Sequence, residues 1–384
     1  MLVGIDASRA SAARRTGTEN YSLYLIRNLL ALGGEHRFRL YFREAPEPSL
    51  LPGAAEERVI PFPRLWTHVA LSWEMFRHPP DLLFVPSHVL PLVQPPCSVA
   101  TVHDLGYHYF PQAHTLSQNL YLRWSTRHNA RSATRVLADS EATRRDLIRL
   151  YGIPEARIAV VYPGRDESLV PVHDPLLLDA VQARYGLRAP YILYLGTLHP
   201  RKNLVRLVQA FAHLQSRASE TAYPLARLQL VLAGQKGWLY EEVFAEVKRL
   251  GLEGRVVLTG YVAGEDLPAL LSGAEAFAFP SLYEGFGFPV LEAMACGVPV
   301  VCSGTSSLPE VAGDAALLVD PLDVEAIGSA LFRLLTDDKL SRELVARGLE
   351  QVQRFSWRRC AQQTLANFEQ AARVAASRRP RAVD

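Results

Sequence analysis

Strand-like and helix-like patterns alternate along this chain in two successive series. In the first series, buried-strand patterns occupy 2–5, 38–42, 81–85, 98–102, 135–138 and 157–161, with helical spacing of apolar residues in the longer gaps. In the second, strands are predicted at 191–195, 228–233, 255–258, 276–279 and 298–302. Because such alternation places parallel strands in one sheet with helices on its faces, the sequence predicts an α/β protein with two Rossmann-like lobes.

The length of the chain agrees with two lobes. At roughly 150 residues per domain, 384 residues correspond to about two to three domains. The periodicity weakens between 165 and 190, around Pro171 and Pro175, as expected of a connecting stretch. We therefore predict an N-terminal domain at 1–170 and a second domain at 185–356.

The composition excludes several classes of protein. Hydrophobic residues make up 49% and charged residues 21%, which disfavours global disorder, and the net charge of +2 disfavours dedicated nucleic-acid binding. Four scattered cysteines suggest a reducing compartment, and no secretory leader pattern is apparent. No run of about 18 apolar residues occurs, so we expect a cytoplasmic protein whose contact with a membrane, if any, is peripheral.

The densest motif is PSLYEGFGFPVLEAMACG at 280–297, which predicts a strand, a glycine loop and a helix. Gly285 and Gly287 would let the backbone approach a ligand, and the start of the helix favours an anion such as phosphate. The carboxylates of Glu284 and Glu292 would be repelled by a diphosphate but accept hydrogen bonds from hydroxyl groups. A sugar for Glu284 and a ribose for Glu292 are the assignments we favour; the alternative is two solvent-facing acids spaced by chance.

Three further sites follow predicted strands. Arg201 and Lys202 could stabilise a departing diphosphate, although taken in isolation a solvated helix start is the better explanation of the pair. His103 is followed by Asp104 at the end of the strand 98–102, and is either catalytic or structural. Gly17 could admit phosphate or acceptor, or simply form a turn before a helix. No G-x-G-x-x-G follows the first strand, so a nicotinamide or flavin enzyme is poorly supported.

With these motifs the chain resembles the retaining glycosyltransferases of family 4, whose E-x7-E motif is matched by Glu284 and Glu292. The resemblance extends through YILYLGTLHPRKNL at 191–204 and through 307–321, and it is closest to bacterial mannosyltransferases of surface-polysaccharide assembly. It implies the GT-B architecture, in which two Rossmann-like lobes face each other across a cleft. The N-terminal lobe would bind the acceptor, the C-terminal lobe would bind the nucleotide sugar, and a terminal helix at 357–384 would pack back on the first lobe.

The resemblance also implies roles for individual residues. His103 would contact the donor sugar near C6, with the role of Asp104 left open, and Lys202 would bind the diphosphate. The second cation would be Arg201 or a group near Thr197, where many relatives carry arginine. Glu284 with the backbone that follows it would hold the sugar, and Glu292 the ribose. The remaining donor-binding positions are Gly17, Gly196, Gly260, Tyr261, Gly285, Phe286 and Gly287.

The expected reaction is transfer of a sugar to a hydroxyl of a glycan or lipid-linked acceptor, with retention. GDP-mannose is the first expectation for the donor and a UDP-sugar the second. No cluster has metal-ligand spacing, so we expect no metal and no other cofactor. The alternatives are a sugar-nucleotide epimerase or hydrolase and a noncatalytic sugar-nucleotide-binding module. An apolar and basic segment at 62–78 is interpreted as an interior helix or as a surface for lipid headgroups.

Overall fold

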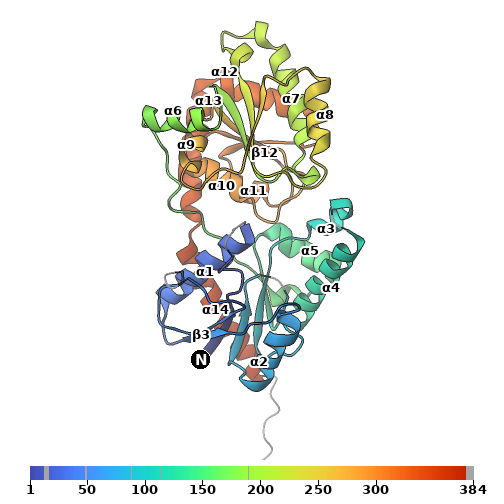
Figure 1. Ribbon diagram of the computed structural model, residues 1–384, viewed down its shortest axis with the longest axis vertical. Helices are drawn as coiled ribbons and strands as arrows, with labels where there is room; N and C mark the ends of the chain where they lie inside the picture. The colour runs from blue at the N-terminus through green and yellow to red at the C-terminus, as the bar shows by residue number, and fades with distance from the viewer. Residues whose placement is uncertain (13–16, 48–49, 88, 114, 189, 378–384) are drawn as a thin grey trace, which may run out of the picture. The chain divides into compact units, whose positions relative to one another are not determined.

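The computed structural model describes residues 1–12, 17–47, 50–87, 89–113, 115–188 and 190–377. The chain forms two compact units (Figure 1). Unit 1 consists of Met1–Gly164 together with Phe355–Asp384, and unit 2 consists of Arg165–Arg354. The chain therefore leaves unit 1 after Gly164 and returns to it at Phe355.

Unit 1 is built on a seven-stranded sheet in the order β3-β2-β1-β4-β5-β6-β7, and every pairing is parallel. The strand order reverses between β1 and β4, which is the switch point where α/β sheets bind ligands. The strands are β1 (Leu2–Asp6), β2 (Arg37–Phe42), β3 (Ala55–Val59), β4 (Leu82–Val85), β5 (Ser98–Val102), β6 (Arg135–Ala138) and β7 (Ile158–Val160). The helices are α1 (Gly17–Leu32), α2 (Ser72–Arg77), α3 (Gly106–Tyr109), α4 (Leu116–Ser132), α5 (Glu141–Tyr151) and α14 (Trp357–Ser377), with short turns η1 (Thr67–Leu71), η2 (Pro111–Ala113) and η3 (Glu155–Arg157).

The last helix of the chain, α14, completes the core of unit 1. It lies along α1, where the rings of Tyr24 and Trp357 stack with centroids 5.5 Å apart. Phe368 is fully buried and its ring lies 5.0 Å from that of Phe84 in β4. A Cβ on Gly164 would be 2.1 Å from the backbone nitrogen of Trp357, so only glycine fits there. Residues 378–384 of the expected terminal helix lie outside the described residues.

Unit 2 repeats this plan with six parallel strands in the order β10-β9-β8-β11-β12-β13. Its switch point lies between β8 and β11. The strands are β8 (Tyr191–Leu195), β9 (Gln229–Ala233), β10 (Val256–Gly260), β11 (Ala276–Phe279), β12 (Val300–Ser303) and β13 (Ala316–Val319). The helices are α6 (Pro175–Arg184), α7 (Leu204–Ser216), α8 (Glu241–Arg249), α9 (Leu267–Ser272), α10 (Phe288–Ala295), α11 (Leu308–Ala312), α12 (Val324–Thr336) and α13 (Asp338–Gln351), with short turns η4 (Pro200–Lys202), η5 (Ala218–Glu220), η6 (Leu225–Arg227) and η7 (Val352–Arg354).

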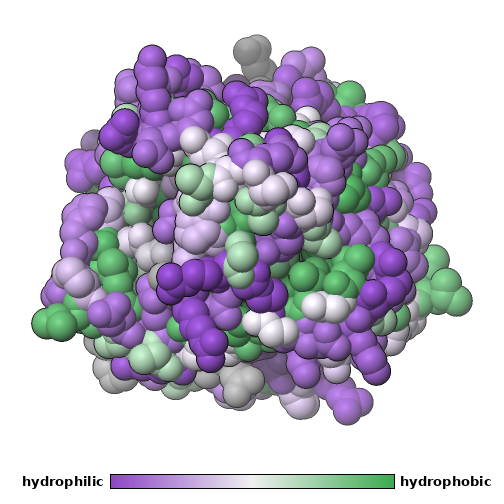
Figure 2. All heavy atoms as spheres, turned by 90° about the horizontal axis from the view of Figure 1, so that it is seen from above, coloured by the Kyte–Doolittle hydropathy of each residue, from purple (hydrophilic) through white to green (hydrophobic). Residues whose placement is uncertain are grey.

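The predicted fold class, α/β with two Rossmann-like parallel sheets, is confirmed. The stretch interpreted as a connection between lobes contains α6, which begins where Asp174 accepts a hydrogen bond from the Leu176 amide and Pro175 fills the first turn. Only Val181 of this helix is buried, which explains its weak periodicity. In the view of Figure 2, hydrophilic residues dominate and hydrophobic ones are scattered among them. Among the described residues, no helix is both long and apolar enough to cross a membrane.

Candidate functional site

The loops that follow β8 and β11 meet at the switch point of unit 2. Arg201 and Lys202 lie in η4 after β8, and Glu284 lies in the loop between β11 and α10. Because β8 and β11 are neighbouring parallel strands, their carboxyl ends bring these residues together although they are distant in the sequence.

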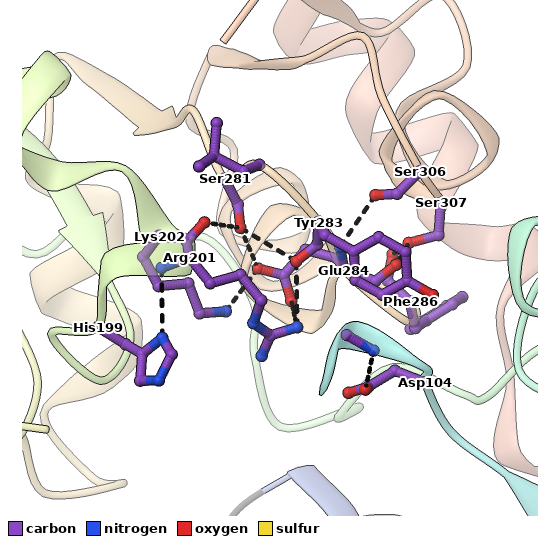
Figure 3. A network of polar contacts seen from close by, with 12 residues as sticks. Asp104, His199, Arg201, Lys202, Ser281, Tyr283, Glu284, Phe286, Ser306 and Ser307 are labelled. Atoms are coloured by element: carbon purple, nitrogen blue, oxygen red, sulfur yellow. Dashed lines mark hydrogen bonds and ion pairs between the residues drawn. The ribbon is translucent and has the colours of Figure 1, made fainter. Parts of the chain in front are cut away.

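The carboxylate of Glu284 is the centre of a polar cluster (Figure 3). The Lys202 Nζ atom donates to Glu284 Oε1 at 2.5 Å, and the Ser281 hydroxyl donates to the same oxygen at 2.6 Å. The Arg201 guanidinium lies 3.7 Å from Oε2. Glu284 is 7% exposed, so the structure holds a buried carboxylate between two cations.

The two cations determine the ionisation of Glu284. Burial by itself raises the pKa of a carboxyl group, but Lys202 and Arg201 outweigh burial and hold the pKa of Glu284 below its usual value. Glu284 is therefore ionised at neutral pH. The cluster is a preformed arrangement of charge rather than a set of mobile surface groups.

Backbone hydrogen bonds join the two loops into one structure. The Arg201 carbonyl accepts from the Leu282 amide at 2.8 Å, and the Arg201 guanidinium donates to the Tyr283 carbonyl at 3.1 Å. Asn203 has a left-handed backbone (φ +62°), and its side-chain amide donates to the carbonyls of Pro280 and Pro321. Asparagine tolerates this conformation better than most residues, so Asn203 positions the two cations that precede it.

Serine side chains from the loop after β12 support the backbone around Glu284. The Glu284 amide donates to the Ser306 hydroxyl at 2.9 Å, and Ser307 donates to the carbonyls of Glu284 and Phe286. Gly287 has φ +121°, and a Cβ there would lie 2.7 Å from a methyl group of Leu308. The Phe286 side chain is buried, so a ligand contact by this loop would come from its backbone.

Glu292 lies in α10 in a different electrostatic setting. Burial and, to a smaller extent, the charge of Asp166 raise the pKa of Glu292 to about 7. Its carboxyl group therefore loses its proton near neutral pH, whereas that of Glu284 is already ionised.

Three glycines lie at the carboxyl ends of adjacent strands in unit 2. The Gly196 amide donates to the Ala233 carbonyl, and the Gly234 amide donates to the Gly260 carbonyl. All three glycines have positive φ, and a Cβ on Gly234 would lie 2.0 Å from the Gly196 carbonyl oxygen. The neighbouring Tyr261 is 68% exposed, and Thr197 is exposed as well.

In unit 1, His103 follows β5 and Asp139 follows the neighbouring strand β6. The His103 Nδ1 atom lies 2.6 Å from Asp139 Oδ2, and the ring of Tyr21 meets the imidazole edge-on at 4.7 Å. Burial lowers the pKa of His103, but the Asp139 carboxylate outweighs it and the net shift is upward. His103 Nε2 is buried without a hydrogen-bond partner among the described residues.

Asp139 was not predicted from the sequence, although its position at the end of a predicted strand matches that of His103. Asp104 accepts from the Gly106 amide at 2.8 Å and so shapes the turn before α3. Gly17 is the first residue of α1. Within the part of the chain that the structure describes, no group of three His, Cys, Asp or Glu residues could hold a metal ion.

Comparison with known families covers nearly the whole chain. Residues 182–351 match the family described as Glycosyl transferases group 1, and residues 15–169 match Glycosyltransferase Family 4. The O-antigen chain mannosyltransferase B of Escherichia coli is 39% identical over 268 residues, which are 70% of this chain and 69% of that protein. The chain belongs to glycosyltransferase family 4. The resemblance predicted from Glu284 and Glu292 is therefore confirmed.

This family 4 glycosyltransferase also resembles the serotype-specific mannosyltransferase WbdA of Escherichia coli, at 31% identity over 62% of this chain. The match spans only 29% of that protein's length. Among solved structures, sucrose-phosphate synthase from Thermosynechococcus elongatus has a TM-score of 0.74 at 23% identity, covering 96% of this chain and 98% of that one. The glycosyltransferase WaaG, which is involved in lipopolysaccharide biosynthesis, has a TM-score of 0.71 at 17% identity. The match covers 96% of this chain and 99% of the WaaG chain. These structures show that the fold is GT-B.

Proposed function

We propose that this glycosyltransferase transfers mannose from GDP-mannose to a hydroxyl of a glycan or lipid-linked acceptor, with retention of configuration. The observation that carries the proposal is the cluster at the switch point of unit 2 in which the half-buried Arg201 and Lys202 flank the buried Glu284. The mannosyltransferases among its relatives support mannose as the sugar. A UDP-sugar is the second candidate donor, because a structural neighbour of the same fold, HepE of Anabaena, was solved with UDP-glucose.

In this proposal the two cations bind the diphosphate. Preorganised positive charge stabilises a leaving group more than bulk water does, and the guanidinium of Arg201 suits a phosphate geometrically. Oε1 of Glu284 accepts from Lys202 and Ser281, whereas Arg201 is beyond hydrogen-bond distance of Oε2. We therefore assign Oε2 to a hydroxyl of the donor sugar.

The other site residues take the roles that the family implies. Glu292 binds the ribose, and the backbone of 285–287 contacts the sugar or phosphate. Gly196, Thr197, Gly260 and Tyr261 line the donor site at the ends of β8 and β10, and Gly17 contacts donor or acceptor. His103, held by Asp139, contacts the sugar near C6. The domain at 185–356 thus binds the donor and the domain at 1–170 binds the acceptor.

The proposed chemical step needs no protein base. The bond between the sugar C1 and the leaving phosphate oxygen breaks, a bond from C1 to the acceptor oxygen forms on the same face, and the departing phosphate takes the acceptor proton. A double displacement would instead need a carboxylate on the opposite face of the sugar. Because Arg201 and Lys202 supply the charge that a divalent ion supplies elsewhere, we expect turnover to persist in EDTA.

The test is a panel of GDP-mannose, GDP, UDP-glucose and UDP, scored first by thermal unfolding of the full chain. A ligand that binds only the folded state raises its stability, and we expect the largest shift with GDP-mannose. The preferred donor is then incubated with and without mannose-containing glycans, and the product anomer is determined by NMR. Acceptor-dependent release of GDP with an α-linked product supports the proposal. Release without acceptor would indicate a hydrolase or epimerase, and binding without turnover a noncatalytic module.

A further inference from the structure

Large apolar side chains lie exposed along one stripe of unit 1. Leu65, which precedes η1, is followed at intervals of three or four residues by Val69, Trp73 and Phe76 in η1 and α2, and Trp73 and Phe76 are 60% and 67% exposed. The interpretation of this segment as an interior helix is wrong for these four residues. The neighbouring Trp66 is the exception, because it is buried and donates to the Ile60 carbonyl.

A second exposed stripe on α4 lies beside the first. Leu120, Tyr121 and Trp124 are 68%, 47% and 45% exposed. His68 of η1 joins the two stripes, since its Nε2 atom lies 3.1 Å from the Tyr121 hydroxyl and its ring 5.5 Å from that of Trp124. We call the combined surface, made of Val69, Trp73, Phe76, Leu120, Tyr121 and Trp124, the aromatic face.

The two segments that carry the aromatic face are rich in arginine and poor in acidic residues. The segments 62–78 and 115–132 contain five arginines, Arg64, Arg77, Arg123, Arg127 and Arg131, all of them exposed, against a single acidic residue, Glu74. Glu74 is buried and already paired with Arg58 and His78. These two segments therefore carry four more basic than acidic side chains (five arginines minus one glutamate), in a chain whose net charge is +2.

We propose that the aromatic face docks this protein on an anionic lipid bilayer. Tryptophan and tyrosine favour the headgroup region because one end of each side chain is apolar and the other polar. Arginine can bury its aliphatic stem while its guanidinium binds phosphate, and Arg77 already lies 5.3 Å from the centre of the Trp73 ring. An exposed helical surface that combines apolar residues with arginines from the same segments matches the chemistry of an anionic interface. The inference is independent of the donor proposed above.

The test is co-sedimentation of the full chain with vesicles of phosphatidylcholine alone and of phosphatidylcholine mixed with phosphatidylglycerol. We expect binding to the mixed vesicles that weakens as salt is added. The Trp73→Ser/Phe76→Ser variant should lose at least about ten-fold in affinity for them. The Arg123→Gln/Arg127→Gln variant should lose roughly five-fold per arginine, and only on the anionic vesicles.

Matched variants in unit 2 serve as controls. Leu176 and Leu177 are exposed on α6 and Arg342 is exposed on α13, so Leu176→Ser/Leu177→Ser and Arg342→Gln should bind vesicles like the wild type. All replaced side chains are exposed, and equal thermal unfolding of the variants establishes that they fold. Equal binding by the aromatic-face variants and the wild type would overturn the proposal. So would a dimer in sedimentation velocity that Trp73→Ser/Phe76→Ser dissociates, since the face would then join two copies of the chain.

Discussion

The two glutamates of the E-x7-E motif illustrate how one residue type acquires two ionisation states. Lys202 and Arg201 keep the pKa of Glu284 low despite its burial, whereas burial and the charge of Asp166 raise the pKa of Glu292 to about 7. The Lys202–Glu284 pair could not be predicted from the sequence. Its partners are 82 positions apart, and only the order of β8 and β11 places them in contact. That Lys202 and Glu284 each belong to the site could be predicted, because each lies in a recognisable motif.

Removing one partner of this buried pair should destabilise unit 2. Lys202→Met leaves the Glu284 carboxylate buried beside Arg201 alone, and such a change typically costs about 3–5 kcal/mol. The double variant Lys202→Met/Glu284→Gln removes both charges and should recover much of that loss. Urea unfolding of the wild type and both variants measures the effect, with Lys339→Met on the exposed face of α13 as the control. A double variant less stable than the single one would contradict this account of the pair.

The raised pKa of Glu292 predicts that the stability of the folded chain depends on pH. The folded chain binds this proton more tightly than the unfolded chain, whose glutamate pKa is 4.5. The tighter binding of this proton therefore stabilises the folded chain fully below about pH 4.5, and this stabilisation is lost as the pH rises to about 7. Glu292→Gln lacks this titration, so its stability relative to the wild type should increase between pH 5 and pH 8 by about 2.5 kcal/mol. Urea unfolding of the wild type and Glu292→Gln at both pH values measures the difference in their stability. A difference that does not change with pH would contradict the raised pKa of Glu292.

At the scale of elements, strands with apolar, buried sequences could be predicted better than the exposed strand β3. Buried strands such as β4 and β11 have continuous apolar sequences and were identified. The edge strand β3 was not, because its sequence AEERV is mostly charged and exposed. Asp139 was missed for a different reason: one aspartate after a strand carries no signal until the adjacent strand places His103 beside it.

The close approach of β8 and β9 predicts a strict requirement for glycine at position 234. A Cβ there meets the Gly196 carbonyl oxygen, a backbone atom that cannot rotate away, and the φ of +147° is itself unfavourable for other residues. Gly234→Ala should lower the free energy of unfolding by about 3 kcal/mol or more. Gly254→Ala, at a position with open space around it, is the matched control in chemical unfolding. Equal stability of Gly234→Ala and Gly254→Ala would contradict the requirement for glycine at position 234.

At the scale of the whole molecule, each unit has its own sheet and core, and α14 packs in unit 1 although it follows unit 2 in the sequence. The alternation of strands and helices predicted two lobes, and the resemblance predicted the return of the last helix. The sequence could not show which residues α14 packs against, because Phe368 and Phe84 belong to segments far apart in the chain.

Truncation of Phe368 should therefore act on unit 1. Phe368→Ala empties a fully buried position against Phe84, which typically costs about 3–5 kcal/mol. Hydrogen exchange followed by mass spectrometry should show faster exchange in β1, β4 and α1, with β8 and β11 unchanged. The exposed Leu318 of β13, changed to alanine, provides the control. Equal acceleration in both sheets would contradict the assignment of α14 to unit 1.

The central claim is that Lys202, beside Glu284, stabilises the leaving diphosphate of a nucleotide sugar. The most direct measurement is the turnover number with the preferred donor and acceptor for the wild type, Lys202→Ala and the control Lys339→Ala. We predict a loss of roughly two to three orders of magnitude for Lys202→Ala, equivalent to about 3–4 kcal/mol of transition-state stabilisation, and none for the control. Turnover by Lys202→Ala at the wild-type rate would contradict the claim.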